Sequence, residues 1–471
     1  MTYPSIAPAA EPPPDDMWGS DWQADLANEE ARLAIVPDLK PETPTGLLPE
    51  EFWKARERLQ HIRRYAHAAG CSGDVLMHSC LARLSGLMPH TIQAVSGIGG
   101  RASLNLFVAT VGGPGAGKST GSSLNRGLLP APYDDFRDGL PVGSGEGVAE
   151  AFMGTVEEET GETRRSKGGA ETPVMRRVRK QVRHNAYFYI DEGQILAKLG
   201  ERSGSTLGET LRRAAVGETL GQTNASEERT RYVEAGSYSL GLLVGFQPST
   251  ALPMLADAGT GTPQRFVWGW AEDPSIPDLP PDSPGPLPEL DCLKSRWDPF
   301  DITYPKRVKD LLWGDRVLRN RGELQVPELD GHAGLIKVKL AALLALLDDR
   351  YGVTEEDWQL AEVMWDASCA VRDSLLARAR REAEAAKQQQ EEAKLQAELR
   401  AHQAKNDDDA TVQRLAIRAR EFARQESGRT FGAFRKSLAS RDRSSAERAV
   451  DRAEAEGWVF MEGNCLCIKT D

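Results

Sequence analysis

The sequence lacks any long hydrophobic run. In this chain of 471 residues the longest apolar run, Leu340 to Leu347, is far shorter than the roughly 20 residues that a membrane-spanning helix needs. The opening segment, MTYPSIAPAAEPPPDD, has neither the basic start nor the apolar centre of a secretory signal peptide. We therefore expect a cytoplasmic protein with no membrane partner.

The sequence is also poor in cysteine. Its six cysteines form no C-x-x-C pair, and no cluster of cysteine and histidine has the spacing of a zinc site. Cys465 and Cys467 stand at the spacing of neighbouring positions on one face of a strand. These features indicate a protein of a reducing compartment, without structural zinc.

Basic charge is in deficit, because the formal net charge is −12. This balance excludes a uniformly basic coat for nucleic acid but is compatible with a local basic surface. Hydrophobic residues make up 40% of the chain and charged residues 27%, which is the composition of an ordinary folded protein. The length suffices for about three domains.

Composition and hydrophobic periodicity divide the chain into segments. Between Asn105 and Glu272 apolar strands alternate with helical stretches, which predicts an α/β core with a largely parallel sheet. The NDDDA stretch (406–410) is expected to interrupt a solvated helical arm, for which a coiled-coil partner is the alternative. The predicted segments are a disordered proline- and acid-rich N-terminus (1–50), a helical cap (51–100), the α/β core (101–273), an extended proline-rich connector (274–330), a helical region (331–377), the helical arm (378–409) and a small C-terminal domain (410–471).

A glycine-rich turn follows the apolar run that ends at Val111. The segment Gly112 to Ser119, GGPGAGKS, matches G-x-x-x-x-G-K-[ST], the phosphate loop of nucleotide-binding proteins. Glycines let backbone N–H groups turn inward around phosphate, while Lys118 reaches the β and γ phosphates and the Ser119 hydroxyl binds Mg²⁺. We predict that ATP and Mg²⁺ bind at Gly112, Gly113, Pro114, Gly115, Ala116, Gly117, Lys118, Ser119 and Thr120. A chance match in a chain with 44 glycines is the alternative.

Two acidic residues end a second apolar run, YFYIDE. Asp191 is expected to hold Mg²⁺ through water, and Glu192 to accept a proton from the attacking water. The second carboxylate favours an ATPase that turns over, because switch GTPases and small-molecule kinases usually lack it. The alternative is a strand that simply ends in two acids.

Two further polar residues stand next to apolar runs. Gln247 ends SLGLLVGF, where its side chain could orient water or sense the γ-phosphate. Arg265 precedes the last core strand, where it could stabilise the transferring phosphoryl group of a neighbouring subunit. Arg212 and Arg213 compete for that role, and a surface salt bridge is the alternative for Arg265.

The order of these motifs resembles a known family. The phosphate loop, YFYIDE, LGETLRRAAVGETLGQ, LLVGFQPSTALPML and TPQRFVW together resemble the primase-associated helicase-like P-loop ATPases, of AAA+ type, found in phages, plasmids and integrated elements. The likeness spans roughly residues 51–376. Gln247 departs from it, since many AAA+ proteins carry Asn as the sensor.

The resemblance implies an AAA+-like core with a helical lid at 331–377. In that lid Lys339, or else Lys337, would sense nucleotide. It also implies a homo-oligomeric ring, hexameric by analogy, in which Arg265 acts across a subunit boundary. No primase–polymerase domain is present, so a separate primase or polymerase would make primers. By the same analogy, QTNASEERTRYVEAGSY (222–238) would carry a DNA-gripping hairpin.

A basic insertion (160–184) precedes the YFYIDE strand. Its cations could neutralise DNA phosphates without reading sequence. Glutamates lie directly upstream, and a flexible loop balanced by those acids is the alternative. The candidate contacts are Arg176, Arg177, Arg179, Lys180 and Arg183.

The C-terminal segment predicts a winged helix-turn-helix. Its second helix would begin after Ser444 or Ser445, end at Gly457 and be followed by a short hairpin. Basic residues outnumber acidic ones from Ala410 onward, and the second helix of such a unit usually contacts DNA. Arg448 and Arg452 would face outward, with Arg441 and Arg443 at the turn. A unit used for protein contacts is the alternative.

Together these patterns predict an ATP-hydrolysing motor on single-stranded or forked DNA. It would be a helicase or a replication-initiation ATPase of a mobile element or phage. A switch ATPase that binds DNA and remodels or loads partner proteins without unwinding is the first alternative. A DNA-bound regulator with slow hydrolysis is the second.

Overall fold

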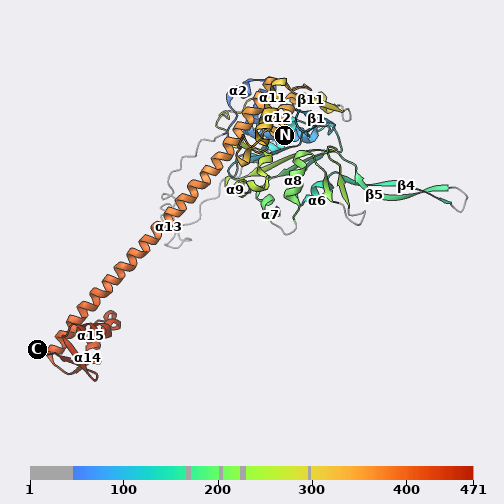
Figure 1. The fold of residues 1–471 in the computed structure, drawn as a ribbon. Helices are drawn as coiled ribbons and strands as arrows, with labels where there is room; N and C mark the ends of the chain where they lie inside the picture. Colours follow the sequence, from blue (N-terminus) through green and yellow to red (C-terminus); the bar gives the residue numbers. More distant parts are fainter. Residues whose placement is uncertain (1–45, 166–170, 201–204, 223–229, 295–298, 470–471) are drawn as a thin grey trace, which may run out of the picture. The chain divides into compact units, whose positions relative to one another are not determined.

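The computed structural model describes residues 46–165, 171–200, 205–222, 230–294 and 299–469 (Figure 1). The chain divides into two compact units, Met1–Leu376 and Ala377–Asp471. In their described parts, the first unit holds a central parallel sheet flanked by helices, and the second combines helices with a three-stranded antiparallel sheet.

Five parallel strands form the central sheet, in the order β10-β2-β9-β6-β3. Strands β2, β9 and β10 are buried along their whole length, which explains why they are continuous apolar runs rather than alternating ones. The predicted α/β class with a parallel sheet is confirmed. Strand β3 was not predicted, because its sequence RDGL is polar and forms a partly exposed edge. The strands are β2 (Leu106–Val111), β3 (Arg137–Leu140), β6 (Asn185–Ile190), β9 (Ser239–Phe246) and β10 (Phe266–Trp270).

Each face of the sheet has its own hydrophobic core. Along β2, Leu106 and Val108 point into the core shared with α4 and α12, whereas Phe107 and Ala109 point into the core shared with α6 and α8. This alternation follows from the two-residue period of a strand. The helices concerned are α4 (Gly73–Leu87), α12 (Ala333–Leu347), α6 (Gly145–Glu150) and α8 (Leu207–Val216).

Helix α4 lies directly on the sheet, with every residue buried. Two glycines permit this close approach: a Cβ on Gly241 of β9 would lie 1.8 Å from the carbonyl oxygen of Ala82, and one on Gly86 would lie 2.6 Å from that of Ala186. Within the predicted helical cap (51–100), α4 packs against the sheet and is itself a layer of the core. Before it come α2 (Glu50–Lys54) and α3 (Glu57–Ala68), and after it the strand β1 (Ile92–Val95).

The expected connector at 274–330 is extended only in its first part. No regular element occurs between β10 and α10 (Asp291–Lys294), where proline is dense. Beyond it, β11 (Phe300–Thr303) pairs in parallel with β1, and α11 (Lys306–Asn320) begins directly after Pro305. Proline is tolerated before the first turn of a helix and disfavoured in its interior, and no proline lies within α11.

Helix α13 (Glu355–Gln425) is continuous through the NDDDA stretch, contrary to the interruption that we expected. Asparagine and aspartate weaken a helix by less than 1 kcal/mol each, whereas glycine or proline would break it, and the stretch contains neither. Its start is capped: Asp357 N–H donates to Thr354 Oγ1 (3.3 Å), and Thr354 N–H donates to Asp357 Oδ2 (2.7 Å). Side chains from Arg381 to Asp407 are exposed, as expected for a solvated arm.

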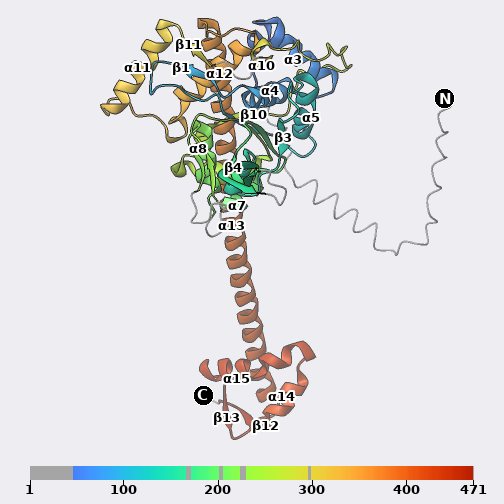
Figure 2. The same cartoon turned by 90° about the vertical axis from the view of Figure 1, so that its right-hand side faces the viewer.

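The C-terminal unit follows the predicted order of helix, turn, helix and hairpin (Figure 2). Its core joins the last turns of α13 to the two short helices around Phe434, Leu415 and Leu466. Strand β14 carries Cys465 and Cys467 in the period-two pattern that their spacing indicated, and both thiols are free. The elements are β12 (Arg429–Thr430), α14 (Phe431–Ser437), α15 (Ala446–Ala455), β13 (Val459–Glu462) and β14 (Cys465–Ile468). Among the described residues, no helix combines the length and the apolar character that crossing a bilayer requires.

Asp74, in the first turn of α4, gives a test of this packing. Its Oδ1 accepts the Leu48 N–H (2.8 Å), and burial raises the pKa of the carboxyl to about 8. Between pH 4 and 8 the Asp74 carboxyl is therefore deprotonated in the unfolded chain but protonated in the native one. Its contribution to the free energy of unfolding falls as pH rises. Asp74→Asn keeps an acceptor without this proton. By chemical denaturation, the free energy of unfolding should fall between pH 5 and 8 by on the order of 2 kcal/mol more in the wild type than in Asp74→Asn.

The control is Glu57→Gln, which removes an exposed carboxylate from the first turn of α3. It should follow the wild-type pH dependence. Parallel curves for the wild type and Asp74→Asn would contradict the assignment.

Candidate functional site

The glycine-rich turn lies at the carboxyl edge of the central sheet. Strand β2 ends at Val111, and helix α5 (Lys118–Leu128) begins where the turn ends. Gly115 (φ 77°) and Gly117 (φ 79°) have left-handed backbone conformations, which glycine adopts without strain. The first N–H groups of α5 have no partner within the helix and face the turn. The turn thus has the geometry of an anion cradle at a helix N-terminus.

Lys118 is folded back onto this turn. Its ammonium donates to the carbonyl oxygens of Gly112 and Gly113, both at 2.7 Å. Partial burial lowers the pKa of Lys118, while the carboxylates of Asp191 and Glu272 act in the opposite direction. Both carboxylates are therefore close enough to act on the charge of the ammonium.

The acidic pair lies at the same edge of the sheet. Asp191 and Glu192 follow β6 directly, separated from β2 by strand β9. The Tyr189 hydroxyl donates to Asp191 Oδ1 (2.6 Å), and Gln194 Nε2 donates to Glu192 Oε2 (2.9 Å). Both carboxylates thus have a neighbour that fixes their orientation.

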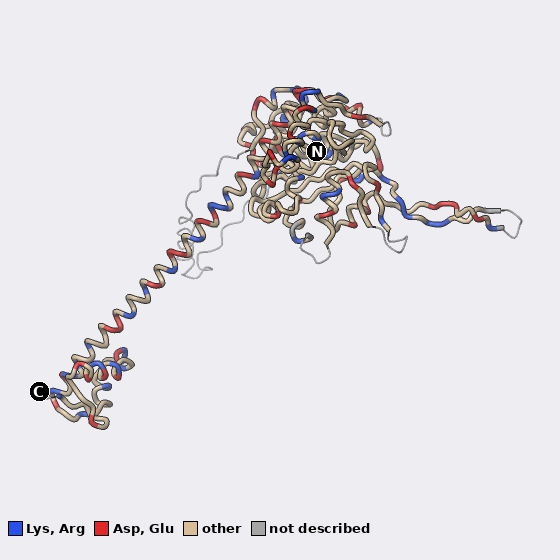
Figure 3. The backbone as a smooth tube through the Cα atoms, viewed as in Figure 1, with Lys and Arg blue, Asp and Glu red and all other residues tan. Residues whose placement is uncertain are grey.

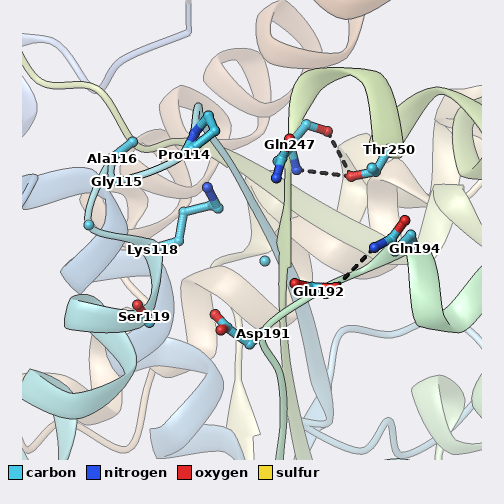
Figure 4. Close-up of a pocket in the computed structure, with 12 residues that line it drawn as sticks. Pro114, Gly115, Ala116, Lys118, Ser119, Asp191, Glu192, Gln194, Gln247 and Thr250 are labelled. Atoms are coloured by element: carbon cyan, nitrogen blue, oxygen red, sulfur yellow. Dashed lines mark hydrogen bonds between the residues drawn. The ribbon is translucent and has the colours of Figure 1, made fainter. Parts of the chain in front are cut away.

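A cavity of about 270 Å³ brings the turn and the acids together (Figure 4). In the figure, Lys118 and Ser119 face Asp191 and Glu192 across it. Gln194 and Thr250 line the cavity but were not identified from the sequence. Gln194 follows the acidic pair closely and Thr250 follows Gln247, and this proximity is the sequence signal that could have identified them. The lining consists of Pro114, Gly115, Ala116, Gly117, Lys118, Ser119, Asp191, Glu192, Gln194, Gly245, Gln247 and Thr250.

Three residues of the predicted loop site do not line this cavity. The Gly112 N–H donates to the carbonyl oxygen of Phe246 (3.1 Å), and the Gly113 N–H donates to Glu272 Oε1 (3.2 Å). Thr120 is exposed in the first turn of α5. The two glycines therefore anchor the turn to the neighbouring strands.

Gln247 enters the cavity from the end of β9. Its N–H donates to Thr250 Oγ1 (3.0 Å), and that hydroxyl donates to the Gln247 carbonyl oxygen (3.0 Å), so the backbone is fixed at the start of α9 (Pro248–Ala256). The side chain is left to line the cavity.

The donor set at the cavity fits Mg²⁺ rather than a metal held by protein alone. Ser119 offers a hydroxyl and Asp191 a carboxylate, and Mg²⁺ usually binds one or two such groups together with waters and phosphate oxygens. Within the described residues, no group of three His, Cys, Asp or Glu side chains could hold a metal ion.

Arg265 does not reach this cavity. It precedes β10, at the amino edge of the sheet, and donates to the Gly261 carbonyl oxygen. Partial burial lowers its pKa, with a further contribution from the Arg212 charge. Arg212 donates to Thr262 Oγ1 (3.1 Å) and Arg213 pairs with Glu209 (2.6 Å), so neither competitor reaches the cavity.

The nucleotide-sensing role predicted for Lys339 does not fit its position in the structure. Its ammonium is buried and donates to the carbonyl oxygens of Asn105 (2.8 Å) and Ala215. Asn105 precedes β2 and Gly112 follows it, so the ammonium and the phosphate loop are roughly 20 Å apart along the strand. Lys337 pairs with Glu362 (3.4 Å) and also lies outside the cavity.

The basic insertion is a β-hairpin that begins earlier than predicted. Strands β4 (Met153–Arg165) and β5 (Glu171–Gln181) pair antiparallel, with an acidic strand beside a basic one (Figure 3). The register places the upstream glutamates opposite the cations, so the charge compensation that we weighed as the alternative is present. Arg177 pairs with Glu157 (3.4 Å), Lys180 with Glu158 (2.6 Å) and Arg179 with Glu150, while Arg183 donates to the Met153 carbonyl oxygen (2.8 Å) and Arg176 stands opposite Glu158.

The arginines of α15 are also engaged. Arg448 forms two hydrogen bonds with Asp408 of α13 (2.6 and 3.1 Å), and Arg452 Nε donates to Gln413 of the same helix (3.1 Å). Arg448 and Arg452 are exposed on the outer face of α15, as predicted, but each side chain already has a polar partner on α13.

The remaining candidates differ in their exposure. Arg441 is 88% exposed in its side chain, and Arg443 donates to the Leu438 carbonyl oxygen (3.2 Å). Of the expected hairpin at 222–238, residues 223–229 lie outside the described part. The segments around them, β7 (Leu220–Gln222) and β8 (Arg231–Val233), pair antiparallel.

The chain matches no protein-family model and no curated protein sequence. The chemistry of the cavity therefore depends on the residues that line it.

Lys339→Met tests the placement of Lys339. The variant fills the same space but leaves two buried carbonyl oxygens without a donor, which should lower the free energy of unfolding by about 1–3 kcal/mol. Calorimetric binding of ATP to the folded variant should stay within about twofold of the wild type. Lys306→Met, at an exposed position of α11 whose i,i+4 pair with Asp310 is open to solvent, should lower the free energy of unfolding by less than about 0.5 kcal/mol and leave ATP affinity unchanged. A selective loss of ATP affinity in Lys339→Met would return this lysine to the nucleotide site.

Proposed function

We propose that the chain is an ATP-hydrolysing motor that acts on DNA, as a helicase or replication-initiation ATPase of a mobile element or phage. The observation that carries the nucleotide part is the cavity in which Lys118 and Ser119 face Asp191 and Glu192. A cation, a hydroxyl and two carboxylates at the carboxyl edge of a parallel sheet match the chemical needs of phosphoryl transfer.

In this proposal each residue at the cavity has one task. The loop N–H groups and Lys118 bind the β and γ phosphates, and Ser119 and Asp191 hold Mg²⁺. The bound Mg²⁺ would neutralise charge on the phosphates. Glu192 takes a proton from the attacking water while Gln247 orients that water.

The remaining parts of the proposal come from the family resemblance and from the placement of residues. The core would be AAA+-like with a helical lid at 331–377, and the C-terminal unit a winged helix. Because Arg265 lies at the opposite edge from its own cavity, it would act on the nucleotide of a neighbouring subunit in a ring. A separate primase or polymerase would supply primers in the cytoplasm.

A second function has a specific observation in its favour. The cations of the β4–β5 hairpin and of α15 are largely paired with acids of the same chain, which weakens their attraction for a polyanion. A switch ATPase that remodels or loads partner proteins on DNA without unwinding would need a lower affinity for the DNA strand than a motor.

Glu192→Gln tests the hydrolytic mechanism. Because the amide cannot accept the proton, steady-state ATP turnover should fall about 100-fold or more, while calorimetric ATP affinity changes by less than about threefold. Glu234→Gln, an exposed glutamate outside the cavity, should behave as the wild type. Full turnover in Glu192→Gln would remove Glu192 as the general base.

The motor and the switch differ in their products. For the motor we expect single-stranded DNA to stimulate ATP hydrolysis severalfold, and a forked duplex to be separated only when ATP is hydrolysed. Steady-state ATP turnover with and without single-stranded DNA measures the stimulation. A fluorescent strand-displacement assay with wild type and Glu192→Gln measures the separation of the duplex. Stimulation without strand separation would support the switch, and negligible turnover would support the slow regulator instead.

A further inference from the structure

The cavity occupies only one side of the phosphate loop. Gln247 follows β9 and the acidic pair follows β6, and both strands lie on the same side of β2 in the sheet. Strand β10 flanks β2 on the other side. We infer that a nucleotide whose γ-phosphate reaches Glu192 extends its nucleoside to the other side of the loop, toward the end of β10.

Glu272 stands at that end of β10. Its Oε1 accepts the Gly113 N–H (3.2 Å), and its Oε2 accepts the Trp270 indole N–H (3.1 Å). The side chain is exposed, and each carboxylate oxygen can accept a second hydrogen bond. A carboxylate is thus fixed beside the loop and remains open to a ligand.

The segment that directly follows β10 (residues 271–275) is called the exit loop here. Its residue Asp273 anchors it to the turn between α3 and α4. Asp273 Oδ2 accepts hydrogen bonds from His67 Nε2 (3.1 Å) and from the Gly73 N–H (3.1 Å). Although burial opposes ionisation, the hydrogen bonds from His67 and Ser275 hold the pKa of Asp273 well below its usual value. Cys71 in the same turn places its Sγ 3.9 Å from the Gly117 carbonyl oxygen. The exit loop and the α3–α4 turn therefore form one preorganised wall beside the phosphate loop.

The chemistry of Glu272 selects what it can bind. A carboxylate repels phosphate oxygens and accepts hydrogen bonds from hydroxyl groups. The hydroxyls that a nucleotide presents beyond its phosphates are those of its ribose, for which acidic side chains serve as acceptors in other nucleotide-binding folds. We propose that the β10 exit loop and the α3–α4 turn form a nucleoside subsite in which Glu272 accepts a hydrogen bond from a ribose hydroxyl. This inference rests on the proposed nucleotide site.

The subsite implies a preference for ribonucleoside triphosphates over their deoxy analogues. Binding of ATP, 2′-deoxy-ATP, 3′-deoxy-ATP and inorganic tripolyphosphate can be compared by calorimetry on the full chain. Because a hydrogen bond to a charged acceptor is strong, we expect at least one deoxy analogue to bind about tenfold or more weakly than ATP. Tripolyphosphate binding reports the phosphate loop alone.

Two substitutions separate recognition from structure. Glu272→Ala should bring ATP and the weaker deoxy analogue to equal affinity, and Glu272→Gln, which keeps an acceptor, should give an intermediate ratio. Tripolyphosphate affinity should not fall in either variant, because an anion near Lys118 is removed. Asp278→Ala, an exposed acid farther along the same connector, should keep the wild-type ratio.

Each remaining outcome has one meaning. Equal affinities of the wild type for ATP and both deoxy analogues would overturn the subsite and leave the phosphate loop intact. A parallel fall for all ligands in Glu272→Ala would show that Glu272 only holds the loop in place. Failure of both ATP and tripolyphosphate to bind the wild type would overturn the proposed function itself.

Discussion

The parallel pairing of β2, β9 and β6 is the constraint on which the site depends. The register sets Val111 beside Phe246 and Ile190 beside Val244, so the three strands end almost level. Because parallel strands end at the same edge, the phosphate loop, the acidic pair and Gln247 leave the sheet close together. Shifting one strand by a single residue would turn its buried side chains to the opposite core and displace the polar residues at its end. Hydrophobic burial in two separate cores therefore fixes the geometry of a polar cavity.

Residues that are local in sequence were predictable, and those decided by distant partners were not. The strands β2, β6, β9 and β10 and the turn between β2 and α5 follow from apolar runs and from glycine, which are local signals. By contrast, β3 is a polar edge strand, and α11 lies in a segment where proline density suggested no helix. Lys339 was misassigned because nothing in its neighbourhood reveals that its ammonium serves the carbonyl oxygens of Asn105 and Ala215.

Charge was the least predictable property. Read along the chain, the β5 segment and α15 are rich in arginine, yet folding places a carboxylate or amide beside most of these side chains. The partners of Arg177 and Lys180 lie on the adjacent strand, and the partner of Arg448 lies forty residues away on α13. The basic composition of these segments therefore overstates the positive electrostatic potential that a ligand would experience at their surface. Glu272, in contrast, was overlooked because it is one acid in an acidic chain, and only its contacts in the fold, with Gly113 and Trp270, distinguish it.

The folded-back position of Lys118 has a consequence for ligand binding. Its ammonium already makes two hydrogen bonds to loop carbonyl oxygens, so an arriving phosphate does not meet an unsatisfied cation. Association is an exchange of acceptors, and its net free energy is the difference between carbonyl and phosphate as partners of the same ammonium. Such a loop discriminates by charge: a neutral acceptor gains nothing over the carbonyls it displaces, whereas a dianionic group does.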